Sequence, residues 1–286
     1  MKLTHPDKLY WPEAKVTKAA LAAYYTRNSR VVLPYLTDRP LSLKRYPEGI
    51  DGMSFFQKNF VDEGAPAFLT TKTIRAKTVR KNVHYLLCNN TQTLRYLANN
   101  GALELHPWNS RTSALDKPDF MVFDLDPGEK TQFVDVINAA RAVKKVLDEK
   151  KLTSFIKTSG KRGLHIYVPI GARYSYDKVR AYARALAQNV VEQNPALTSL
   201  AVHPKDRRDK IYIDYLRNST GQTVIAPYCT RATPNATIST PLEWSEVKKG
   251  LNPNKFTIKT IEKRLKKKGD PWRSIFKQPN ALSFSK

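Results

Sequence analysis

The sequence predicts an α/β fold in which mixed β-sheets are packed with helices. Apolar runs at 120–125 and 164–169 have the length of buried strands. Residues 131–149 and 177–193 instead carry apolar side chains at helical spacing, which is typical of amphipathic helices. A further strand is expected over 211–218, where apolar and polar residues alternate. Strands that alternate with helices in this way indicate an α/β architecture.

The remaining parts of the chain are expected to add shorter elements. Thr17 can cap a helix over roughly 18–30, because its hydroxyl can accept a hydrogen bond from a backbone N–H of the first turn. The other expected elements are strands over 39–47, 83–88 and 102–110, a β-ribbon or loop over 70–82, a helix over about 91–99, a hairpin turn at 219–222 with a return strand over 223–228, and helical segments from about 240 onward.

The charge balance is the strongest global feature of the sequence. The chain of 286 residues carries 49 Lys and Arg against 25 Asp and Glu, a formal net charge of +24. Such an excess favours a polyanionic partner, most often nucleic acid. An anionic membrane surface or the packing of ribosomal RNA would also suit the charge. However, the basic residues are mixed with aromatic ones in a globular pattern, and the sequence has no lipid-anchor motif. Nucleic acid is therefore the expected partner.

The sequence also disfavours membrane and secreted environments. It contains no run of 18 apolar residues, so we expect no transmembrane helix and no membrane partner. Residues 1–6 lack the apolar segment that a secretory signal needs. Cys88 and Cys229 lie far apart, which suits a reducing cytosol and offers neither a zinc site nor a disulfide framework. The expected location is the cytoplasm.

The stretch 119–128 combines a buried strand with two acidic residues and a turn. Side chains alternate along a strand, so Asp124 and Asp126 are expected on one side, about 7 Å apart along the backbone. Two neighbouring carboxylates repel and raise each other's pKa. A divalent cation such as Mg²⁺, which prefers oxygen ligands, relieves this repulsion. The alternative is that residues 126–128 form only a turn and that Asp124 is incidental.

Asp214 is the third candidate carboxylate. The alternation of its strand places it on the face opposite Ile211, Ile213 and Tyr215. A single Asp inside such an apolar strand is costly unless charged partners or a metal meet it. Three carboxylates can hold two metal ions, as phosphoryl-transfer sites require. The sequence therefore predicts a site for divalent ions.

The loop 158–163 is a candidate phosphate-binding segment. Its two glycines allow backbone N–H groups to approach an anion, and beside them lie Ser159, Lys161 and Arg162. The spacing is not that of a P-loop, and a strand rather than a helix is expected to follow. On that strand, His165 lies opposite its apolar neighbours, toward polar surroundings.

Two further residues suit either a structural or a binding role. His106 shares a strand face with Glu104. A lone His on a strand is usually structural, but close to a carboxylate metal site it can bind a ligand. Arg231 follows the expected return strand and could clamp phosphate oxygens with its planar fork of donors.

Basic residues of the N-terminal third suit contacts with a nucleic-acid backbone. Lys8, Lys15 and Lys18 cluster there, either as a solvated face or as a phosphate anchor, since lysine binds phosphate as a point charge. The segment 70–82 adds five cations without an acidic residue between them: Lys72, Arg75, Lys77, Arg80 and Lys81.

Phe55 and Phe56 are adjacent on an extended segment, so their side chains should point in opposite directions. One of them can therefore lie in the core while the other is exposed. An exposed Phe beside Lys58 suits base stacking combined with a phosphate contact. Core packing remains the simpler interpretation of either Phe alone.

Taken in order, these motifs resemble the polymerase domain of bacterial DNA ligase D, which belongs to the archaeo-eukaryotic primase superfamily. The main motifs are Asp-Leu-Asp-Pro-Gly at 124–128, Thr-Ser-Gly-Lys-Arg-Gly-Leu-His at 158–165 and Ile-Asp-Tyr-Leu-Arg-Asn at 213–218. Supporting motifs are Pro-Asp-Lys-Leu-Tyr-Trp-Pro at 6–12, Phe-Phe-Gln-Lys-Asn at 55–59, Leu-Glu-Leu-His at 103–106 and Ile-Ala-Pro-Tyr at 225–228. The resemblance covers roughly residues 4–245. Each motif alone is weak, whereas the ordered set is specific.

The resemblance implies an archaeo-eukaryotic primase-like fold, with mixed β-sheets flanked by helices around a central catalytic cleft. A single primase-polymerase domain would span residues 1–286. Within it, an N-terminal module with DNA-binding elements would take about 1–115, a catalytic module about 116–245, and a basic C-terminal extension 246–286.

The resemblance also implies an activity and a set of residue roles. The chain would be a primer-extending, gap-filling polymerase that acts at DNA breaks in non-homologous end joining and prefers ribonucleoside triphosphates. Asp124, Asp126 and Asp214 would be the catalytic carboxylates and would bind two divalent ions, Mn²⁺ or Mg²⁺. The nucleotide-binding residues would be His106, Ser159, Lys161, Arg162, His165, Arg217 and Arg231. On the DNA, Lys8 and Lys18 would hold a 5′-phosphate, Phe55 and Phe56 would stack at the template gap, and the backbone would contact Lys58, Lys72, Arg75, Lys77 and Arg80.

One departure and two rival functions accompany the resemblance. The family's loop often has Lys where this chain has Arg162, which preserves the charge but changes the geometry. The chain has no room for ligase or nuclease domains, so we expect a stand-alone polymerase that needs a separate ligase and a Ku-like end-binding protein. The rivals are a primase that starts strands without a primer, and a non-catalytic DNA-end-binding protein whose aspartates only balance nearby cations.

Overall fold

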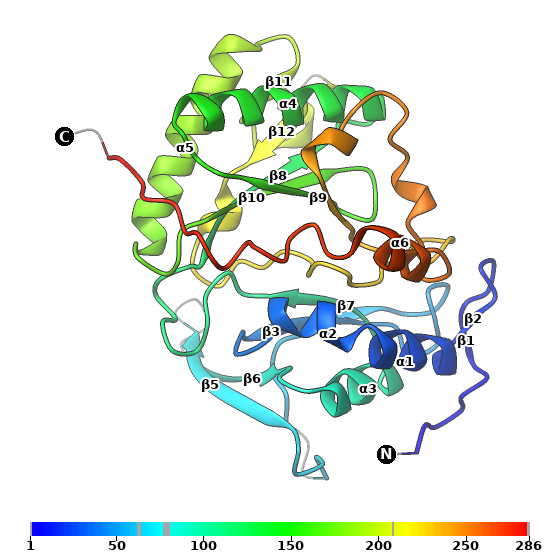
Figure 1. Ribbon diagram of the computed structural model, residues 1–286. Coiled ribbons are helices and arrows are strands. Elements are labelled where there is room, and N and C mark those ends of the chain that lie inside the picture. The colour runs from blue at the N-terminus through cyan, green and yellow to red at the C-terminus, as the bar shows by residue number, and fades with distance from the viewer. Residues whose placement is uncertain (1, 62–63, 77–80, 208, 285–286) are drawn as a thin grey trace. The chain divides into compact units, whose positions relative to one another are not determined.

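The computed structural model describes residues 2–61, 64–76, 81–207 and 209–284, and the chain forms two compact units (Figure 1). The first unit comprises Met1–Ser113, Thr223–Ser239 and Asn254–Gly269. The second comprises Ala114–Gln222, Thr240–Pro253 and Asp270–Lys286. Each unit thus takes three stretches of chain, whereas the sequence suggested three consecutive modules. A single domain over 1–286 stays a prediction.

A six-stranded mixed sheet forms the centre of the second unit, in the order β11-β12-β8-β10-β9-β13. The strands are β8 (Phe120–Asp126), β9 (Phe155–Thr158), β10 (Leu164–Pro169), β11 (Thr198–Ser199), β12 (Ile211–Asp214) and β13 (Pro241–Leu242). Neighbouring strands are antiparallel, apart from the parallel pair β11 and β12. Every residue of β10 is buried, as is every residue of β8 except the last. The apolar runs in the sequence therefore mark the two central strands.

Two long helices of the second unit, α4 (Phe133–Glu149) and α5 (Tyr176–Gln193), pack against the sheet and against each other. α4 begins with a capping box, in which the side chains of Gln132 and Asp135 each accept a backbone N–H of the other's residue. The Ser175 side chain caps α5. Both helices agree with the sequence prediction to within two residues.

The segment after β12 differs from the prediction. The strand ends at Asp214 and continues as a short 3₁₀ turn, η3 (Leu216–Asn218). The predicted turn at 219–222 forms. The prediction of a return strand over 223–228 was wrong, because this stretch makes isolated contacts within the first unit instead of pairing along β12. The N–H of Ala226 donates to the carbonyl of Leu105 at 3.0 Å. The chain thus leaves β12 instead of folding back along it.

Among its described residues, the first unit contains three small antiparallel sheets. Their pairings are β4-β3-β7, β1-β2 and β5-β6. The strands are β1 (Leu9–Trp11), β2 (Val16–Thr17), β3 (Leu41–Arg45), β4 (Phe55–Gln57), β5 (Thr70–Ala76), β6 (Lys81–Leu87) and β7 (Ala102–Pro107). The pairing of β5 with β6 confirms the predicted ribbon. The predicted DNA contacts Lys77 and Arg80 lie outside the described residues.

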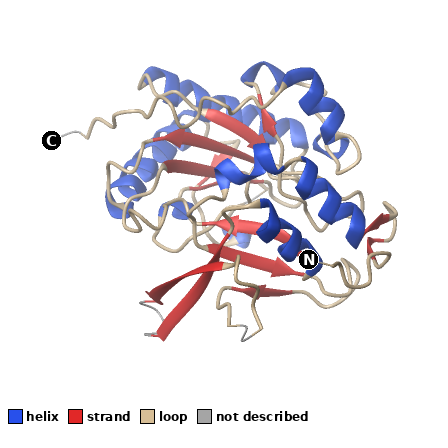
Figure 2. Ribbon diagram, turned by 60° about the horizontal axis from the view of Figure 1, so that its bottom comes forward, coloured by secondary structure: helices blue, strands red, loops and turns tan. Residues whose placement is uncertain are grey.

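The helices of the first unit are shorter than α4 and α5. Figure 2 shows the helices of the chain in blue and its strands in red. Those of the first unit are the helices α1 (Lys18–Arg27), α2 (Ser29–Val32), η1 (Leu33–Tyr35), α3 (Thr91–Asn99) and α6 (Ile261–Lys268). Thr17 accepts the N–H of Ala20 at 3.1 Å, which confirms the predicted cap. The helix expected over 18–30 is interrupted at Asn28, whose side-chain amide donates to the carbonyl of Tyr24 at 2.9 Å and closes the last turn.

The part of the chain after 240 contributes mainly short turns besides α6. These are η4 (Trp244–Glu246) and η5 (Pro253–Lys255), so the predicted helical segments are only partly realised. The indole N–H of Trp272 donates to the carbonyl of Ile156 at 3.0 Å, which attaches the final stretch to β9 of the second unit. Within the described ranges, no helix is both long and apolar enough to cross a membrane.

Candidate active site

The strand register of the second unit places four charged or polar side chains in one row. β9, β10, β8 and β12 lie side by side, and their register pairs Lys157 with His165, His165 with Asp124, and Asp124 with Asp214. Directly opposed residues of neighbouring antiparallel strands point to the same face of the sheet. Asp126, two residues after Asp124, joins the same face. The sequence thus assembles this cluster through β-pairing alone.

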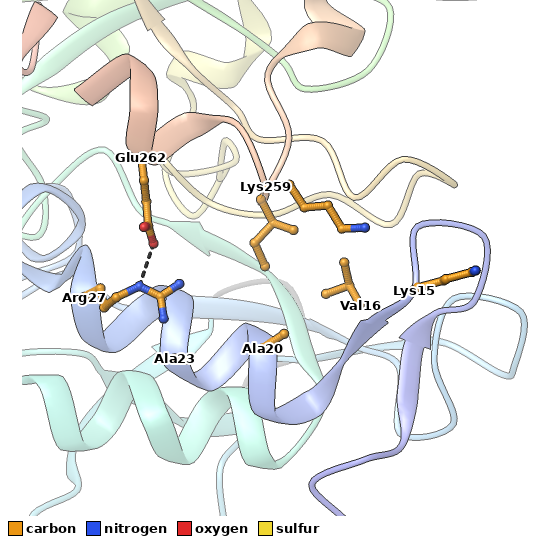
Figure 3. Close-up of a pocket in the computed structure, with 8 residues that line it drawn as sticks. Lys15, Val16, Ala20, Ala23, Arg27, Lys259 and Glu262 are labelled. Atoms are coloured by element: carbon orange, nitrogen blue, oxygen red, sulfur yellow. Dashed lines mark hydrogen bonds and ion pairs between the residues drawn. The ribbon is translucent and has the colours of Figure 1, made fainter. Parts of the chain in front are cut away.

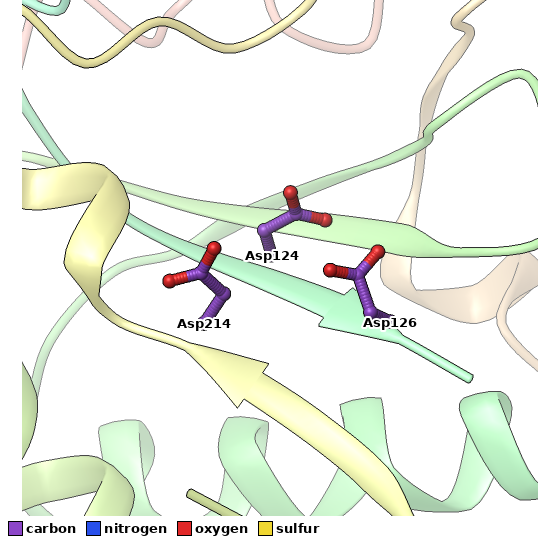
Figure 4. Close-up of side chains that lie close together, drawn as sticks. All are labelled: Asp124, Asp126 and Asp214. Carbon is purple, nitrogen blue, oxygen red and sulfur yellow. The ribbon is translucent and has the colours of Figure 1, made fainter. Parts of the chain in front are cut away.

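Three of these side chains form a carboxylate cluster, which we call the aspartate triad: Asp124, Asp126 and Asp214. One oxygen of each lies within 4.8 Å of the others. Figure 4 shows the three side chains on one side of the strands, with helices of the unit drawn on the other side (Figure 4). Asp124 and Asp214 are each only 7% exposed, and Asp126 is half-buried. The alternation read from the sequence therefore does bring the carboxylates together.

Two cations and a histidine contact the triad or its partners. Nε of Arg217 lies 3.2 Å from Oδ2 of Asp124 and 3.0 Å from Oδ2 of Asp214. Nε2 of His165 lies 3.1 Å from Oδ1 of Asp124, and Nδ1 of the same ring lies 3.0 Å from Nζ of Lys157. An ammonium can only donate, so His165 accepts at Nδ1 and donates from Nε2 to the carboxylate.

These surroundings separate the pKa values of the three carboxyl groups. Burial would raise the pKa of Asp124, but the contacts with His165 and Arg217 outweigh it and hold that pKa below its usual range. Burial and then the charge of Asp124 raise the pKa of Asp126 to about 7. Burial also raises the pKa of Asp214. The triad therefore carries more negative charge than its present partners neutralise.

The donor set of the triad fits a hard divalent cation. Its three side chains offer carboxylate oxygens, the ligands that Mg²⁺ and Mn²⁺ prefer. Asp124 and Asp214 have hydrogen bonds or ion pairs, whereas the carboxylate of Asp126 has neither among the residues that the structure describes. A half-buried carboxylate without a partner is costly unless a cation reaches it. The triad could therefore hold a metal ion.

The loop between β9 and β10 is organised around Ser159. Its hydroxyl oxygen accepts the backbone N–H of Lys161 at 3.1 Å and that of Gly163 at 3.0 Å. A Cβ at Gly163 would collide with the carbonyl oxygen of Leu125, so the loop needs glycine to lie against β8. Two backbone N–H groups of this predicted phosphate loop thus point to Ser159 in the structure.

Arg162 ties the same loop to the end of β8. Its Nη2 donates to the carbonyl of Gly128 at 2.8 Å and to that of Glu129 at 3.1 Å. These acceptors follow shortly after Asp126 in the chain. The structure therefore brings Ser159, Lys161 and Arg162 to the strand end that carries the triad.

A second cluster of predicted ligands lies in the first unit, around Glu104. This carboxylate is 1% exposed. Its Oε2 lies 3.2 Å from Nε2 of His106, and its Oε1 lies 3.3 Å from Nε of Arg231. Oε1 also accepts the backbone N–H of Ala232 at 3.1 Å. We call Glu104, His106 and Arg231 the Glu104 cluster; its carboxylate orients two predicted ligands at once.

The phenylalanine pair departs from the sequence prediction. Phe55 is 42% exposed and Phe56 is 60% exposed, so core packing holds for neither of them. Both belong to β4, an edge strand of its sheet, and each ring lies near a cation of β3. The rings of Phe56 and His106 are 5.8 Å apart between centroids. Both phenylalanine rings are thus exposed on the edge strand.

The two predicted phosphate-binding lysines lie near the N-terminus of the first unit. Nζ of Lys8 donates to Oε2 of Glu48 at 2.8 Å. Lys18 is 5% exposed, and its Nζ donates to the hydroxyl of Thr4 at 3.2 Å. Burial and then the charge of Lys8 lower the pKa of Lys18. An ammonium group disfavoured by burial and a neighbouring positive charge suits an anion such as phosphate.

The remaining predicted backbone contacts are dispersed. Lys58, Lys72 and Arg75 are all exposed. However, Lys72 and Arg75 lie three residues apart on β5, and strand alternation sends them to opposite faces. They do not form one positively charged face of the ribbon.

A pocket of about 350 Å³ opens elsewhere in the first unit, between α1 and the chain around α6 (Figure 3). Its lining includes Lys15, Lys259 and an ion pair between Arg27 and Glu262 with an N–O distance of 2.7 Å. Lys15 is the one member of the N-terminal lysine cluster that lines it, and none of the residues to which the family resemblance gives a metal, nucleotide or 5′-phosphate role does so.

Three participants in these clusters are absent from the predicted ligands: Glu104, Lys157 and Tyr212. Lys157 is completely buried, and the hydroxyl of Tyr212 lies 3.3 Å from Oδ1 of Asp214. A charged residue inside an apolar strand, the signal that identified Asp214, is also present at Lys157. No local signal links Glu104 to Arg231, which is distant in the sequence.

The chain shares its sequence pattern with a known protein family. Residues 17–272 match the model of the LigD primase-polymerase domain family. The chain is 34% identical over 282 residues to the bifunctional non-homologous end joining protein LigD of Bacillus subtilis, covering 98% of this chain and 44% of that protein. It is 31% identical over 274 residues to the multifunctional LigD of Pseudomonas aeruginosa, covering 95% of this chain and 32% of that protein. The chain thus spans less than half the length of both relatives.

A solved structure extends the similarity to the whole fold. The polymerase domain from Mycobacterium tuberculosis ligase D, in complex with DNA, matches with a TM-score of 0.91 at 29% identity. The match covers 98% of this chain and 99% of that one. It confirms the predicted fold class, in which mixed sheets are flanked by helices in the manner of archaeo-eukaryotic primases.

Proposed function

The chain belongs to the LigD primase-polymerase domain family, a family of nucleotidyltransferases, and from this premise we propose that it extends primer strands at DNA breaks. The reaction is attack of a primer 3′-hydroxyl on the α-phosphorus of a nucleoside triphosphate, with release of pyrophosphate. The observation that carries the proposal is the aspartate triad, whose oxygens lie within 4.8 Å of one another on adjacent strands.

The triad is proposed to hold two divalent ions, Mn²⁺ or Mg²⁺. When bound, such ions lower the pKa of an attacking hydroxyl and stabilise the charge of the leaving pyrophosphate. The protein's own contribution is a rigid arrangement of donors. Asp124 is oriented by His165, which Lys157 holds with its Nε2 proton toward the carboxylate. Asp214 is oriented by the N–H of Leu216, which donates to its Oδ1 at 2.9 Å.

The residues proposed to bind the nucleoside triphosphate are His106, Ser159, Lys161, Arg162, His165, Arg217 and Arg231. The cationic members suit the triphosphate, because arginine presents a planar fork of donors to phosphate oxygens. His106 and Arg231 share the buried carboxylate of Glu104, which supports a common role for them.

The first unit is proposed to bind the DNA. Lys8 and Lys18 would bind the 5′-phosphate at the far side of a gap, and Phe55 and Phe56 would stack on bases of the template. Lys58, Lys72, Arg75, Lys77 and Arg80 are proposed contacts with the DNA backbone. The exposure of both phenylalanines and the net charge of +24 support this assignment.

The proposed setting is non-homologous end joining in a prokaryotic cell, on the nucleoid. Both curated relatives carry end joining in their names, and the solved relative is in complex with DNA. We propose gaps and overhangs with a 5′-phosphate as substrates, ribonucleoside triphosphates as the preferred nucleotides, and a separate ligase and a Ku-like end-binding protein as partners.

The proposal is tested by extension of a labelled primer across a short gap that bears a 5′-phosphate. The reaction contains Mn²⁺ and either ribonucleoside or deoxyribonucleoside triphosphates, and a gap with a 5′-hydroxyl serves as the matched control. We expect incorporation that favours ribonucleotides and the phosphorylated gap. No incorporation with any metal or nucleotide, together with retained DNA binding, would leave a DNA-end-binding protein. Synthesis without a primer would instead indicate a primase.

A further inference from the structure

Arg217 lies between two carboxylates of the triad, Asp124 and Asp214, and neutralises part of their charge. A single nitrogen, Nε, lies 3.2 Å from Oδ2 of Asp124 and 3.0 Å from Oδ2 of Asp214. The guanidinium therefore bridges two carboxylates from adjacent strands. Its side chain is 34% exposed, so it is open to solvent on one side.

The backbone of Arg217 is firmly held in this place. It belongs to η3, whose last residue, Asn218, is completely buried. The Asn218 side chain accepts the N–H of Val122 at 2.8 Å and donates to the carbonyl of Val122 at 2.7 Å. It thereby continues the pairing of β12 with β8 beyond Asp214, where the strand itself has ended. The carboxylate bridge is consequently a built feature of the fold.

The oxygens that Arg217 contacts are candidate ligands for a metal ion. Oδ1 of Asp124 already faces Nε2 of His165, and Oδ1 of Asp214 accepts the N–H of Leu216. The two Oδ2 atoms are the ones that face each other across Arg217. A guanidinium and a divalent ion carry charge of the same sign, so both cannot hold these atoms without strong repulsion.

We propose that Arg217 is a resident counter-cation of the triad, which a divalent ion displaces when it binds. Released from the carboxylates, the guanidinium presents its donors to the anionic phosphates of the nucleotide. The same side chain then couples the two ligands: a nucleotide that retains Arg217 makes it easier for the metal to reach the triad. Such coupling is reciprocal, so the metal also strengthens nucleotide binding. This inference rests on the proposed metal site and nucleotide substrate.

The opposite role for Arg217 is a fixed support that orients Asp124 and Asp214 toward the metal. The two roles predict opposite effects of removing its charge. Without a competing counter-cation, the metal-free triad has uncompensated negative charge and binds a divalent ion more tightly. Without a fixed support, the carboxylates lose their orientation and bind the ion more weakly.

The test is Mn²⁺ binding to the full chain, measured by electron paramagnetic resonance of the free ion, without nucleotide or DNA. The proteins are the wild type, Arg217→Gln and the matched control Arg207→Gln. Arg207 lies close enough to influence the charge of Asp126, but its guanidinium packs on Tyr212, with Cζ 4.1 Å from the ring centroid. Its replacement removes the same charge from the same neighbourhood without breaking the carboxylate bridge.

We expect Arg217→Gln to tighten Mn²⁺ binding by about tenfold or more, within the usual range of coupling between sites. Arg207→Gln should change it clearly less. Weaker Mn²⁺ binding by Arg217→Gln, or equal tightening in both variants, would overturn the counter-cation role. If none of the three proteins binds Mn²⁺, the proposed metal site itself is wrong, which is a distinct outcome.

A second measurement keeps the test informative if Arg217→Gln folds poorly. Addition of a non-hydrolysable nucleoside triphosphate should tighten Mn²⁺ binding to the wild type. The gain should shrink in Arg217→Lys, which keeps the charge but loses the planar fork of donors. An undiminished gain in this variant would show that the coupling does not pass through Arg217.

Discussion

The aspartate triad and the Glu104 cluster are both buried charge clusters, but they are neutralised to different degrees. Glu104 is a single carboxylate that meets one guanidinium, one imidazole and one backbone N–H. The triad has three carboxylates, and Arg217 contacts two of them. Its third member, Asp126, responds with a pKa raised to about 7 by burial and the charge of Asp124.

This difference separates a structural use of buried charge from a binding use. A carboxylate whose partners match its charge is stable as it stands and can orient the groups around it. A carboxylate cluster with surplus negative charge costs free energy until a further cation arrives. We infer that Glu104 positions His106 and Arg231, whereas the triad is suited to binding metal ions. Acid-to-amide substitutions should therefore have opposite effects on the stability of the two clusters.

The largest stability effect is expected for Glu104→Gln. The substitution leaves Arg231 as an unpaired charge with only 12% of its side chain exposed. Removing one partner of a buried ion pair typically destabilises a protein by about 3–5 kcal/mol. We expect a loss near the lower end of that range, measured as a shift of the urea midpoint at pH 7. Glu48→Gln is the matched control, because Glu48 pairs with Lys8 at the surface and should not shift the midpoint measurably. Equal shifts of the urea midpoint in both variants would contradict a structural role for the buried charge of Glu104.

Asp126→Asn is expected to stabilise the metal-free protein, raising its free energy of unfolding by about 1–3 kcal/mol at pH 8. The pKa of Asp126 is raised on folding, so the native state holds a proton that the unfolded state releases above pH 4. Stability of the wild type therefore falls as pH rises from about 4 to about 7 because of this group, and then levels off. Asparagine does not titrate and lacks this loss.

The measurement is the unfolding midpoint in EDTA at several pH values. The advantage of Asp126→Asn over the wild type should grow from pH 4 to pH 7, and added Mn²⁺ should reverse it. A variant that is less stable than the wild type at pH 8 without metal would contradict the account.

The smallest effect is expected at the 5′-phosphate site. Combining Lys8→Gln with Lys18→Met should reduce the preference for a phosphorylated gap over a hydroxyl gap by roughly tenfold, the scale of one charge-assisted hydrogen bond. Methionine preserves the apolar packing of the buried Lys18 stem. The measurement is relative extension on the two gaps, with Lys150→Gln as a control for loss of charge. An unchanged preference would refute the anchor.

Local sequence patterns predicted most of the second unit. Alternation around Asp124 and the isolated charge of Asp214 sufficed to bring the triad together, because β-pairing converts local periodicity into spatial proximity. The same reasoning did not identify Lys157, although the strand register places it in one row with His165, Asp124 and Asp214. The central strands and both long helices followed from apolar periodicity alone.

The first unit was less predictable because its contacts join distant stretches. Residues 223–228 look like a return strand beside β12, yet Ala226 hydrogen-bonds to Leu105 of β7. This path of the chain places Arg231 beside Glu104, a contact that no local sequence pattern predicts. Phe55 and Phe56 are both exposed, although they point to opposite faces of their strand, because alternation separates a buried from an exposed face only where one face is covered. An edge strand such as β4 need not meet that condition.

The most direct test of the central claim is primer extension by the double variant Asp124→Ala and Asp126→Ala. Extension across a phosphorylated gap with Mn²⁺ should fall at least ~10³-fold, since the groups proposed to hold the ions are lost. DNA binding, measured in parallel, should persist. Asp148→Ala, which removes an exposed carboxylate of α4, should extend like the wild type. Full activity of the double variant would contradict the account, because the triad would then be structural.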